Sequence, residues 1–375
     1  MPDFADYWQT LDQNALRLQI DSQSPADVER ALTCHKPGIT ELMALLSPAA
    51  EQYLEPLAEK ALQLTRQRFG NTVNFFAPLY LSNLCANDCT YCGFSMSNRI
   101  RRKTLDSREI GLECDALRQL GFNQVLLVTG EHQTKVGMDY FRQHIPDIRR
   151  RFSSLMMEVQ PLQEQEYREL HQLGLDGVLV YQETYHASCY ATHHLRGNKQ
   201  DFLFRLQTPE RLGRAGIDKI GLGVLAGLSG HWRTDCLMMG EHLNWLQKYY
   251  WRSRFSVAFP RLRPCAGGIT PASQMNERQL LQTMCAFRLF SPQTDISLST
   301  RESPVFRDHA IPITVTTASA FSKTTPGGYA SDTDALEQFS PDDHRRPEVV
   351  AAALQRAGLQ PVWKDWEFAF GRESA

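Results

Sequence analysis

The order of hydrophobic and polar residues changes near residue 70. Up to that point apolar residues recur at helical spacing, in a stretch that begins at Asp27 and in a longer one from Ile39 that stops at Gly70. Beyond it, short apolar, β-branched or aromatic runs alternate with amphipathic segments. Such alternation predicts βα units built around a parallel sheet.

Eight of the short apolar runs are predicted strands. They cover residues 71–81, 123–130, 153–160, 176–182, 219–227, 254–262, 294–300 and 310–319. The predicted helices cover 106–120, 138–152, 163–173, 201–215, 235–250, 276–290, a short piece near Phe306, and 347–357. Eight strands with helices between them predict an α/β fold of the (βα)₈ TIM-barrel type, whose active site lies in the loops after the strand C-termini. A doubly wound open sheet has the same periodicity and stays open as an alternative.

This pattern divides the chain into three parts. Residues 1–70 form an N-terminal helical extension, residues 71–323 form the barrel, and residues 324–375 form a C-terminal segment that caps the barrel or meets a partner. The segment is rich in polar and turn residues before its short helix.

Composition narrows the class of protein. The chain has 375 residues, of which 42% are hydrophobic and 22% charged, so it can bury a sizeable core. Its 40 Lys and Arg against 42 Asp and Glu argue against a dedicated surface for nucleic acid or an anionic membrane. The N-terminus lacks a secretory pattern, and no apolar run reaches the length of about 18 residues that a membrane span needs. We therefore expect a cytoplasmic protein.

The nine cysteines do not form the paired framework of a small secreted domain. Three of them, Cys85, Cys89 and Cys92, lie in the sequence CANDCTYC directly after the first predicted strand. They could be chemically silent, ligands of structural zinc, or ligands of an iron–sulfur cluster. Structural zinc takes four ligands, and after Cys92 the next cysteine and histidine, Cys114 and His132, form no second paired motif. Three thiolates on a 4Fe-4S cluster would leave one iron open to a substrate.

The CxxxCxxC spacing resembles the signature of the radical S-adenosylmethionine (SAM) superfamily. This resemblance implies that Cys85, Cys89 and Cys92 hold a 4Fe-4S cluster whose remaining iron chelates the amino and carboxylate groups of SAM. Tyr91, the aromatic residue before the last cysteine, would contact the adenine.

A second motif follows the second predicted strand. In VTGEH, Gly130 and Glu131 resemble the Gly-Gly-Glu element of the superfamily, which bonds the SAM amino group through its backbone. Thr129 replaces the first glycine of that element, which weakens the match. A glycine after a strand can equally be a simple turn.

Three further positions match expected contacts to SAM. Glu183, in YQETYH, falls where a polar residue would hold the ribose hydroxyls, and Arg205 corresponds to an arginine that pairs with the SAM carboxylate. Leu225 lies in GLGVLAGL, which resembles the segment whose backbone lies against adenine. The alternatives are that Glu183 is a solvated loop residue and that Arg205 makes a helix-surface ion pair of little energetic value.

Over nearly its whole length the chain resembles the tyrosine lyases of thiamine thiazole biosynthesis. The matching segments include PLYLSNLCANDCTYCGFSMSNRI, GLDGVLVYQETYH, RAGIDKIGLG, FPRLRPC, ISLSTRES, SAFSKTTPGGY and PVWKDWE. The implied reaction splits SAM into methionine and a 5′-deoxyadenosyl radical, which takes a hydrogen atom from the amino group of L-tyrosine. The Cα–Cβ bond then breaks to give 2-iminoacetate (dehydroglycine) and p-cresol, and the radical leaves as 5′-deoxyadenosine. The cofactor carries the difficult chemistry, and the protein orients the substrate and excludes water.

Such an enzyme must hold the carboxylate of its amino-acid substrate, and a planar guanidinium suits that task. Arg301, which ends the seventh predicted strand in LSTRES, is the candidate, with Ser299 and Thr300 beside it. The alternative is that Arg301 pairs with Glu302 or Asp308 as a structural salt bridge. Two arginines that end the sixth strand are weaker candidates for polar contacts: Arg261 and Arg263.

Related radical enzymes carry a second cluster, which this sequence does not provide for. The tyrosine lyase that matures iron-only hydrogenases uses a C-terminal cysteine motif, whereas the last cysteine here is Cys285. Biotin synthase needs further cluster ligands inside its barrel. The candidates here are better explained as core or loop residues: Cys189, Cys236, Cys265 and Cys285. A non-catalytic iron–sulfur electron carrier and a zinc-stabilised binding protein remain as alternatives from other functional classes.

The remaining expectations concern partners. Arg99, Arg101, Arg102 and Lys103 follow the cysteine motif and form either a solvated face or a docking site for an acidic flavodoxin or ferredoxin that donates the electron. Arginines 149–151 close a helix, where positive charge suits the helix dipole. Because 2-iminoacetate hydrolyses readily, the resemblance also implies delivery to a thiazole synthase in a complex.

Overall fold

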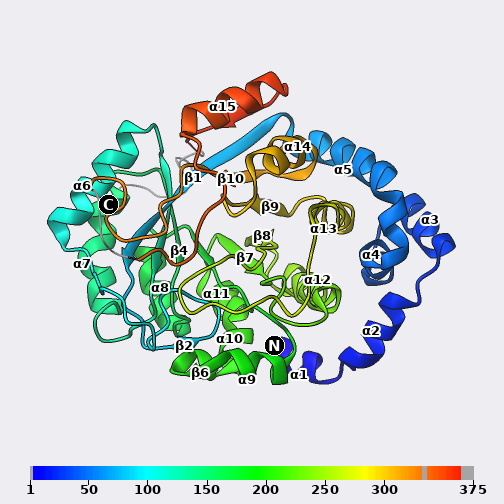
Figure 1. Cartoon of the computed structure of the whole chain (residues 1–375), viewed down its shortest axis with the longest axis horizontal. Helices are drawn as coiled ribbons and strands as arrows, with labels where there is room; N and C mark the ends of the chain where they lie inside the picture. The colour runs from blue at the N-terminus through cyan, green and yellow to red at the C-terminus, as the bar shows by residue number, and fades with distance from the viewer. Residues whose placement is uncertain (1–2, 332–335, 365–375) are drawn as a thin grey trace.

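Eight parallel strands close into a barrel in the computed structural model, which describes residues 3–331 and 336–364 (Figure 1). The strands follow one another around the barrel in chain order, and closure comes from pairing of the first with the last, Asn74 opposite Thr317 to Phe76 opposite Ser319. The strands are β1 (Thr72–Ser82), β3 (Gln124–Thr129), β4 (Ser154–Glu158), β5 (Gly177–Leu179), β7 (Lys219–Gly223), β8 (Arg254–Ala258), β9 (Asp295–Leu298) and β10 (Thr317–Ser319). The predicted TIM-type barrel is confirmed, and the open sheet is excluded.

The eighth predicted strand was placed too early. Residues 310–314 end the helix α14 (Pro304–Thr314), so only the last third of the run is strand. A helix start at Ser303 explains why these residues are helical. Ser303 accepts a hydrogen bond from the backbone N–H of Phe306, and Pro304 occupies the first turn, so a helix begins here and continues into the apolar run. The helix was therefore longer than the short piece expected near Phe306.

The helices that surround the barrel lie close to the predicted ranges, with one division. The segment 201–215 forms two helices, because Pro209 starts a new helix after Gln207. The helices on the barrel are α6 (Ser107–Gln119), α7 (Met138–Arg149), α8 (Glu164–Gln172), α9 (Ala187–His193), α10 (Phe202–Leu206), α11 (Thr208–Ala215), α12 (Trp232–Tyr249), α13 (Glu277–Phe290) and α14. Of these, α9 was not predicted.

The N-terminal region is helical, as predicted, and wraps around the outside of the barrel (Figure 1). Its helices pack mainly against α12, α13 and α14. They are α1 (Phe4–Gln9), α2 (Gln13–Asp21), α3 (Pro25–Thr33), α4 (Ile39–Leu46), the 3₁₀ helix η1 (Pro48–Tyr53) and α5 (Leu54–Phe69). Gly70 ends α5 with a positive φ of 61°, a conformation that favours glycine.

The C-terminal segment joins the sheet. After α15 (Pro347–Arg356), β11 (Gln360–Val362) pairs with the start of β1, a strand that the sequence pattern did not predict. Residues 365–375 of the expected C-terminal segment lie outside the described residues. The division of the chain at residues 70 and 323 stays a prediction.

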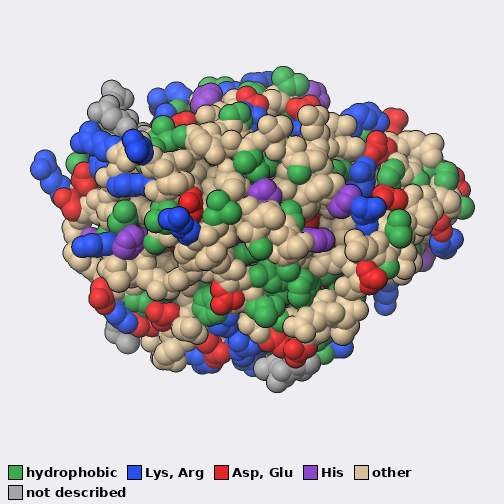
Figure 2. Space-filling view, turned by 60° about the horizontal axis from the view of Figure 1, so that its bottom comes forward, with side chains coloured by type: hydrophobic (Ala, Val, Ile, Leu, Met, Phe, Trp, Pro, Cys, Tyr) green, Lys and Arg blue, Asp and Glu red, His purple; other side chains and the backbone are tan. Residues whose placement is uncertain are grey.

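Apolar side chains fill the barrel beneath its C-terminal opening. A separate cluster, formed by Phe76, Tyr80, Phe94, Leu126, Val128, Met156 and Leu179, lies under the cysteine loop. Charged side chains of both signs are interspersed on the outer surface (Figure 2), in keeping with the net charge of −2. Among the described helices, none combines the length and the apolar character that a membrane crossing requires.

Candidate functional site

A cavity opens at the C-terminal ends of the barrel strands and is lined by every site residue that the sequence predicts. All twelve line it: Cys85, Cys89, Tyr91, Cys92, Gly130, Glu131, Glu183, Arg205, Leu225, Ser299, Thr300 and Arg301. These residues come from the segments that follow five barrel strands, β1, β3, β5, β7 and β9, and Arg205 comes from helix α10. The fold therefore brings them together, while their individual roles stay predictions.

The cysteine loop is held by a dense set of backbone contacts. The backbone N–H of Cys89 donates to Ser95 Oγ at 2.8 Å, and Arg102 donates to four backbone carbonyls, those of Asn83, Phe94, Ser95 and Asn98. Arg102 therefore stabilises the loop from inside. It is not available for docking an electron donor, which corrects the expectation that it belongs to a solvated or docking surface. Arg99 and Arg101 are exposed, and Lys103 pairs with Glu109 at 3.1 Å.

The three cysteines are free thiols inside the cavity. Burial raises the pKa of Cys85 to about 11, and the nearby Glu131 carboxylate adds to the effect; burial also raises the pKa of Cys92. Within the described residues, no three His, Cys, Asp or Glu side chains converge as ligands of one metal ion would. The zinc interpretation gains no support from this geometry. A soft thiolate set around a common space suits a multi-iron cluster, whose positive irons would stabilise the ionised thiols.

Gly130 fits where no larger residue could. A Cβ at this position would lie 2.4 Å from the carbonyl oxygen of Leu84, immediately before the first cysteine. The backbone N–H of Ala86 donates to the carbonyl of Glu131 at 2.8 Å, so the VTGEH turn and the cysteine loop are joined directly. Only the second glycine of the expected pair is needed for the close contact between this turn and the cysteine loop. The first position is Thr129, which is the last residue of β3 and lies in the sheet.

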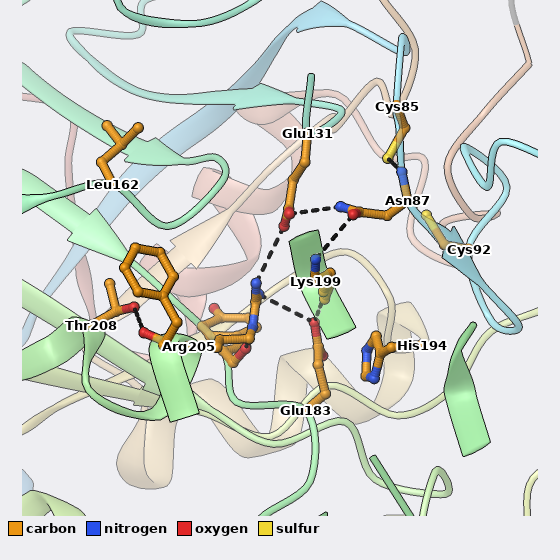
Figure 3. Close-up of polar contacts among 12 residues, drawn as sticks. Cys85, Asn87, Cys92, Glu131, Leu162, Glu183, His194, Lys199, Arg205 and Thr208 are labelled. Carbon is orange, nitrogen blue, oxygen red and sulfur yellow. Dashed lines mark hydrogen bonds and ion pairs between the residues drawn. The ribbon is translucent and has the colours of Figure 1, made fainter. Parts of the chain in front are cut away.

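Four charged side chains form a buried network beside the cysteines (Figure 3). Arg205 lies 3.2 Å from Glu131 and 3.6 Å from Glu183, and Lys199 lies 2.8 Å from Glu183. Burial alone would raise the pKa of Glu183, but Lys199 and Arg205 outweigh it and hold that pKa below its usual value. With Arg205 only 6% exposed, neither the surface pair nor the solvated carboxylate considered as alternatives is present.

The loop that carries Glu183 is also tied to the segment of Leu225. Glu183 has a φ of 70°, which is strained for a residue with a side chain, and its carbonyl accepts a hydrogen bond of 2.8 Å from the backbone N–H of Leu225. Strained backbone persists only where surrounding contacts hold it, and it is common at functional sites. The conformation of Glu183 is consistent with such a site.

Arg301 does not form the structural salt bridges that were the alternative to a substrate role. Glu302 pairs with Arg261, and Asp308 pairs with Arg345 at 2.9 Å. Its guanidinium instead lies 3.4 Å from the centre of the Phe339 ring, facing the cavity. Arg261 is therefore a structural residue. Two other contacts place neighbouring groups: the backbone N–H of Arg301 donates to Ser299 Oγ at 3.3 Å, and Arg263 lies 3.5 Å from Asp342.

Three lining residues were not predicted from the sequence: Lys199, in the 3₁₀ helix Asn198–Gln200, Gln338, in the C-terminal segment, and Glu158, which ends β4. Nor was His194, which does not line the cavity but contacts the lining residue Tyr91. Gln338 accepts a hydrogen bond of 2.7 Å from Tyr80 Oη, and its amide nitrogen lies 3.8 Å from Cys92 Sγ. Of these residues, only Glu158 could have been found from the sequence, because a charged residue at the C-terminal end of a buried barrel strand is a candidate for the active site.

Comparison with known proteins identifies the family. A model of the radical SAM superfamily matches residues 79–236, and a model of the Biotin and Thiamin Synthesis associated domain matches residues 258–360. The curated 2-iminoacetate synthase of Salmonella typhimurium is 67% identical over 374 residues, covering 100% of this chain and 99% of that protein. The chain belongs to the 2-iminoacetate synthase family. The Escherichia coli member is 66% identical over the same share of both chains.

Solved structures agree with this 2-iminoacetate synthase assignment. The crystal structure of HydG, a maturase of the FeFe-hydrogenase, has a TM-score of 0.84 at 28% identity and covers 98% of this chain and 80% of its own. Methylornithine synthase shares the fold with a TM-score of 0.72 at 19% identity, over 89% of this chain and 96% of its own. As a radical SAM enzyme, a 2-iminoacetate synthase uses a 4Fe-4S cluster and SAM, which the thiol set and the cavity fit.

Proposed function

We propose that this chain cleaves the Cα–Cβ bond of L-tyrosine to 2-iminoacetate and p-cresol while SAM becomes 5′-deoxyadenosine and methionine. The observation that carries the proposal is the shared cavity, which is lined by three free thiols and by the guanidinium of Arg301. That guanidinium forms no ion pair among the described residues and donates only a long hydrogen bond of 3.5 Å to the backbone carbonyl of Arg261. The 67% identity to a protein named 2-iminoacetate synthase supports the same reaction.

We assign the cofactor end of the cavity to the cysteine loop and the charged network beside it. Cys85, Cys89 and Cys92 would hold the cluster, and Arg205 and Glu183 would meet the carboxylate and ribose of SAM. The cluster and SAM, when bound, supply a carbon-centred radical that removes a hydrogen atom from the substrate. Lys199 and Glu131 keep Glu183 and Arg205 in place through the ion pairs described above.

The opposite end suits an aromatic amino acid. Arg301 offers a planar donor for the α-carboxylate, and Ser299 and Thr300 stand beside it on the same loop. The apolar cluster inside the barrel provides a dry surface for the phenol ring. Phe339, whose ring lies 3.4 Å from the Arg301 guanidinium, lines the cavity beside it and would help to exclude water from the reacting atoms.

A direct assay tests this function. Protein reconstituted with iron and sulfide without oxygen is given SAM, dithionite and L-tyrosine, and 5′-deoxyadenosine and p-cresol are measured together. We expect both products from the unaltered chain and neither from Cys85→Ser, Cys89→Ser or Cys92→Ser. Cys34→Ser, at a partly exposed free cysteine that ends α3, is the matched control. A cluster that takes up electrons without forming either product would indicate an electron carrier instead.

The proposal extends to the partners and the compartment. The exposed side chains Arg99, Arg101 and Arg196, with the exposed apolar residues Met96 and Leu195, lie on the cysteine loop and on β6 (His194–Arg196), which pairs with β2 (Asp88–Cys89). We assign this surface to an acidic flavodoxin or ferredoxin. A cytoplasmic location and delivery of 2-iminoacetate to a thiazole synthase complete the proposal.

A further inference from the structure

Glu158 is an acidic residue that pairs with no basic side chain among the residues that the structure describes. It is the last residue of β4, and its side chain lines the same cavity as Arg301. Its carboxylate makes no hydrogen bond or ion pair with any residue that the structure describes, although its backbone belongs to the β3–β4 ladder. Arg301 likewise forms no ion pair among those residues. Two partly buried side chains of opposite charge therefore line one cavity without forming an ion pair with each other.

Such an arrangement is costly in the free protein. A charge removed from water needs a compensating partner, and a protein that leaves two opposite charges unpaired in a cavity is prepared for a ligand that brings both complements. An amino-acid zwitterion is such a ligand, because its carboxylate and ammonium groups are attached to the same carbon.

We propose that Glu158 binds the α-ammonium group of the substrate and takes one proton from it before the radical step. The inference rests on the proposed function, since it assumes an amino-acid substrate whose carboxylate is held by Arg301. In the transfer, an N–H bond of the ammonium group breaks and an O–H bond forms on Glu158, while the electron pair stays on nitrogen. Atoms and charge balance, and no further reactant is needed.

The proton transfer has a chemical purpose. An ammonium group has no lone pair, so removal of a hydrogen atom from it would leave a cationic nitrogen radical without stabilisation. The neutral amine keeps a lone pair that stabilises the radical, and it also removes a positive charge from beside Arg301. Glu158 is the available base in the cavity that is not already paired, because Glu131 and Glu183 are committed to Arg205 and Lys199.

The surrounding charges support this role. Burial raises the pKa of Glu158 to about 7 and Glu183 adds to the rise, while Arg301, Lys199 and Arg205 oppose it. Tyr80 and Tyr181 face the same carboxylate, and burial raises the pKa of each, so both stay neutral. A base with this pKa is ionised in part near neutral pH. Its pKa is closer to that of an α-ammonium group than the pKa of an ordinary glutamate is, which favours proton transfer.

The position of Glu158 favours the amine over the phenol of the substrate. The carboxylate interacts electrostatically both with Arg301 and with the network of Glu183, Lys199 and Arg205. It thus lies within electrostatic range of both the proposed carboxylate site and the charged network at the proposed cofactor end, and the atom that loses hydrogen must lie near both. Contact with the phenol hydroxyl is the competing arrangement, which the experiment below separates.

The test measures binding without turnover. Reconstituted enzyme with SAM and no reductant is dialysed against L-tyrosine or against 3-(4-hydroxyphenyl)propionate, which lacks the amine. We expect the unaltered protein to bind tyrosine at least about tenfold more tightly, because a hydrogen-bonded charge is lost with the analogue. Glu158→Gln should bind the two within about twofold, and Glu158→Asp should keep part of the preference. Retention of the full preference by Glu158→Gln would overturn the proposal.

Two controls make the result specific. Glu59→Gln, an isosteric change on the exposed face of α5, should behave as the unaltered protein. L-phenylalanine probes the phenol contact: if Glu158→Gln removes the preference for tyrosine over phenylalanine and leaves the amine preference intact, Glu158 binds the hydroxyl and the proposal is wrong.

A measurement on the unaltered protein covers the case in which Glu158→Gln does not fold. Ionised Glu158 favours the ammonium ligand, so the preference for tyrosine over the analogue should fall as pH is lowered through about 7. A preference that is constant between pH 6 and pH 8 would contradict the proposal. These binding results can fail while the unaltered enzyme still makes p-cresol, so a failure of this inference is distinct from a failure of the proposed function.

Discussion

The hydroxyl oxygen of Tyr91 lies 2.7 Å from Nε2 of His194, and this contact fixes the ring that precedes the last cysteine. His194 Nδ1 lies 2.7 Å from the carbonyl of Tyr190, so it carries the proton and Nε2 is the acceptor for Tyr91. Burial lowers the pKa of His194 to about 2, with Lys199 adding to the effect, so the imidazole is neutral at all working pH values. The Tyr91 side chain is thus held in one orientation where it lines the cavity.

The first prediction concerns the hydrogen bond between Tyr91 and His194. Tyr91→Phe removes the hydrogen bond and leaves Nε2 of the buried His194 unpaired, which costs about 1–3 kcal/mol. We expect the KM for SAM to rise several-fold while the ratio of p-cresol to 5′-deoxyadenosine stays unchanged. Initial rates at varied SAM concentration check this expectation. A normal KM for SAM would remove Tyr91 from the cofactor end of the cavity.

The second prediction concerns Arg301. Arg301→Gln removes the proposed partner of the substrate carboxylate, so SAM cleavage should continue while tyrosine cleavage falls. We expect the ratio of p-cresol to 5′-deoxyadenosine to drop at least about tenfold, in line with loss of a charged hydrogen bond. Arg278→Gln, on the exposed side of α13, is the control. Unchanged coupling in Arg301→Gln would place the carboxylate elsewhere.

The third prediction separates docking charges from structural ones after the cysteine motif. Arg99→Glu with Arg196→Glu should slow turnover supported by flavodoxin and leave turnover with dithionite unchanged, because only a protein donor needs steering. Arg68→Glu, exposed on α5, should affect neither. Arg102→Ala should instead reduce iron content and both activities, since it unties four carbonyls of the loop. Equal slowing with both donors in the double variant would argue against the docking surface.

The fourth prediction concerns pH and the N-terminal helix α1. Glu210 accepts hydrogen bonds from the backbone N–H of Phe4 and from Trp245 Nε1, and burial raises its pKa to about 7, with Asp3 adding to the rise. Because the folded pKa exceeds the unfolded one, this contribution to stability is complete below about pH 4.5 and is lost as pH rises through about 7.

Thermal unfolding from pH 5 to pH 8.5 tests that dependence. The unaltered chain should lose on the order of 2–3 kcal/mol of stability through this group, and Glu210→Gln should remove that share of the loss. Parallel pH profiles for the two proteins would contradict the assignment.

Local sequence patterns were sufficient for the barrel and for the cysteine loop. The strand runs and their spacing follow from backbone periodicity, and Cys85, Cys89 and Cys92 lie within eight residues. Lys199 and Gln338 were out of reach because their roles depend on contacts with Glu183 and Cys92, which are distant in the chain. Arg102 was misjudged because a basic run gives no indication of which arginine turns inward. The predicted strand over 310–319 took in the end of α14 for a related reason, since an apolar run fits a buried helix as well as a strand.

The fate of labelled tyrosine tests the central claim most directly. Reconstituted enzyme is given SAM, reductant and L-tyrosine carrying ¹³C at every carbon, and the products are identified by mass spectrometry. We predict p-cresol that contains the labelled ring and β-carbon, together with glyoxylate from hydrolysed 2-iminoacetate that contains the labelled α- and carboxyl carbons. Formation of 5′-deoxyadenosine with tyrosine left intact, or with its Cα–Cβ bond retained in every product, would contradict the account.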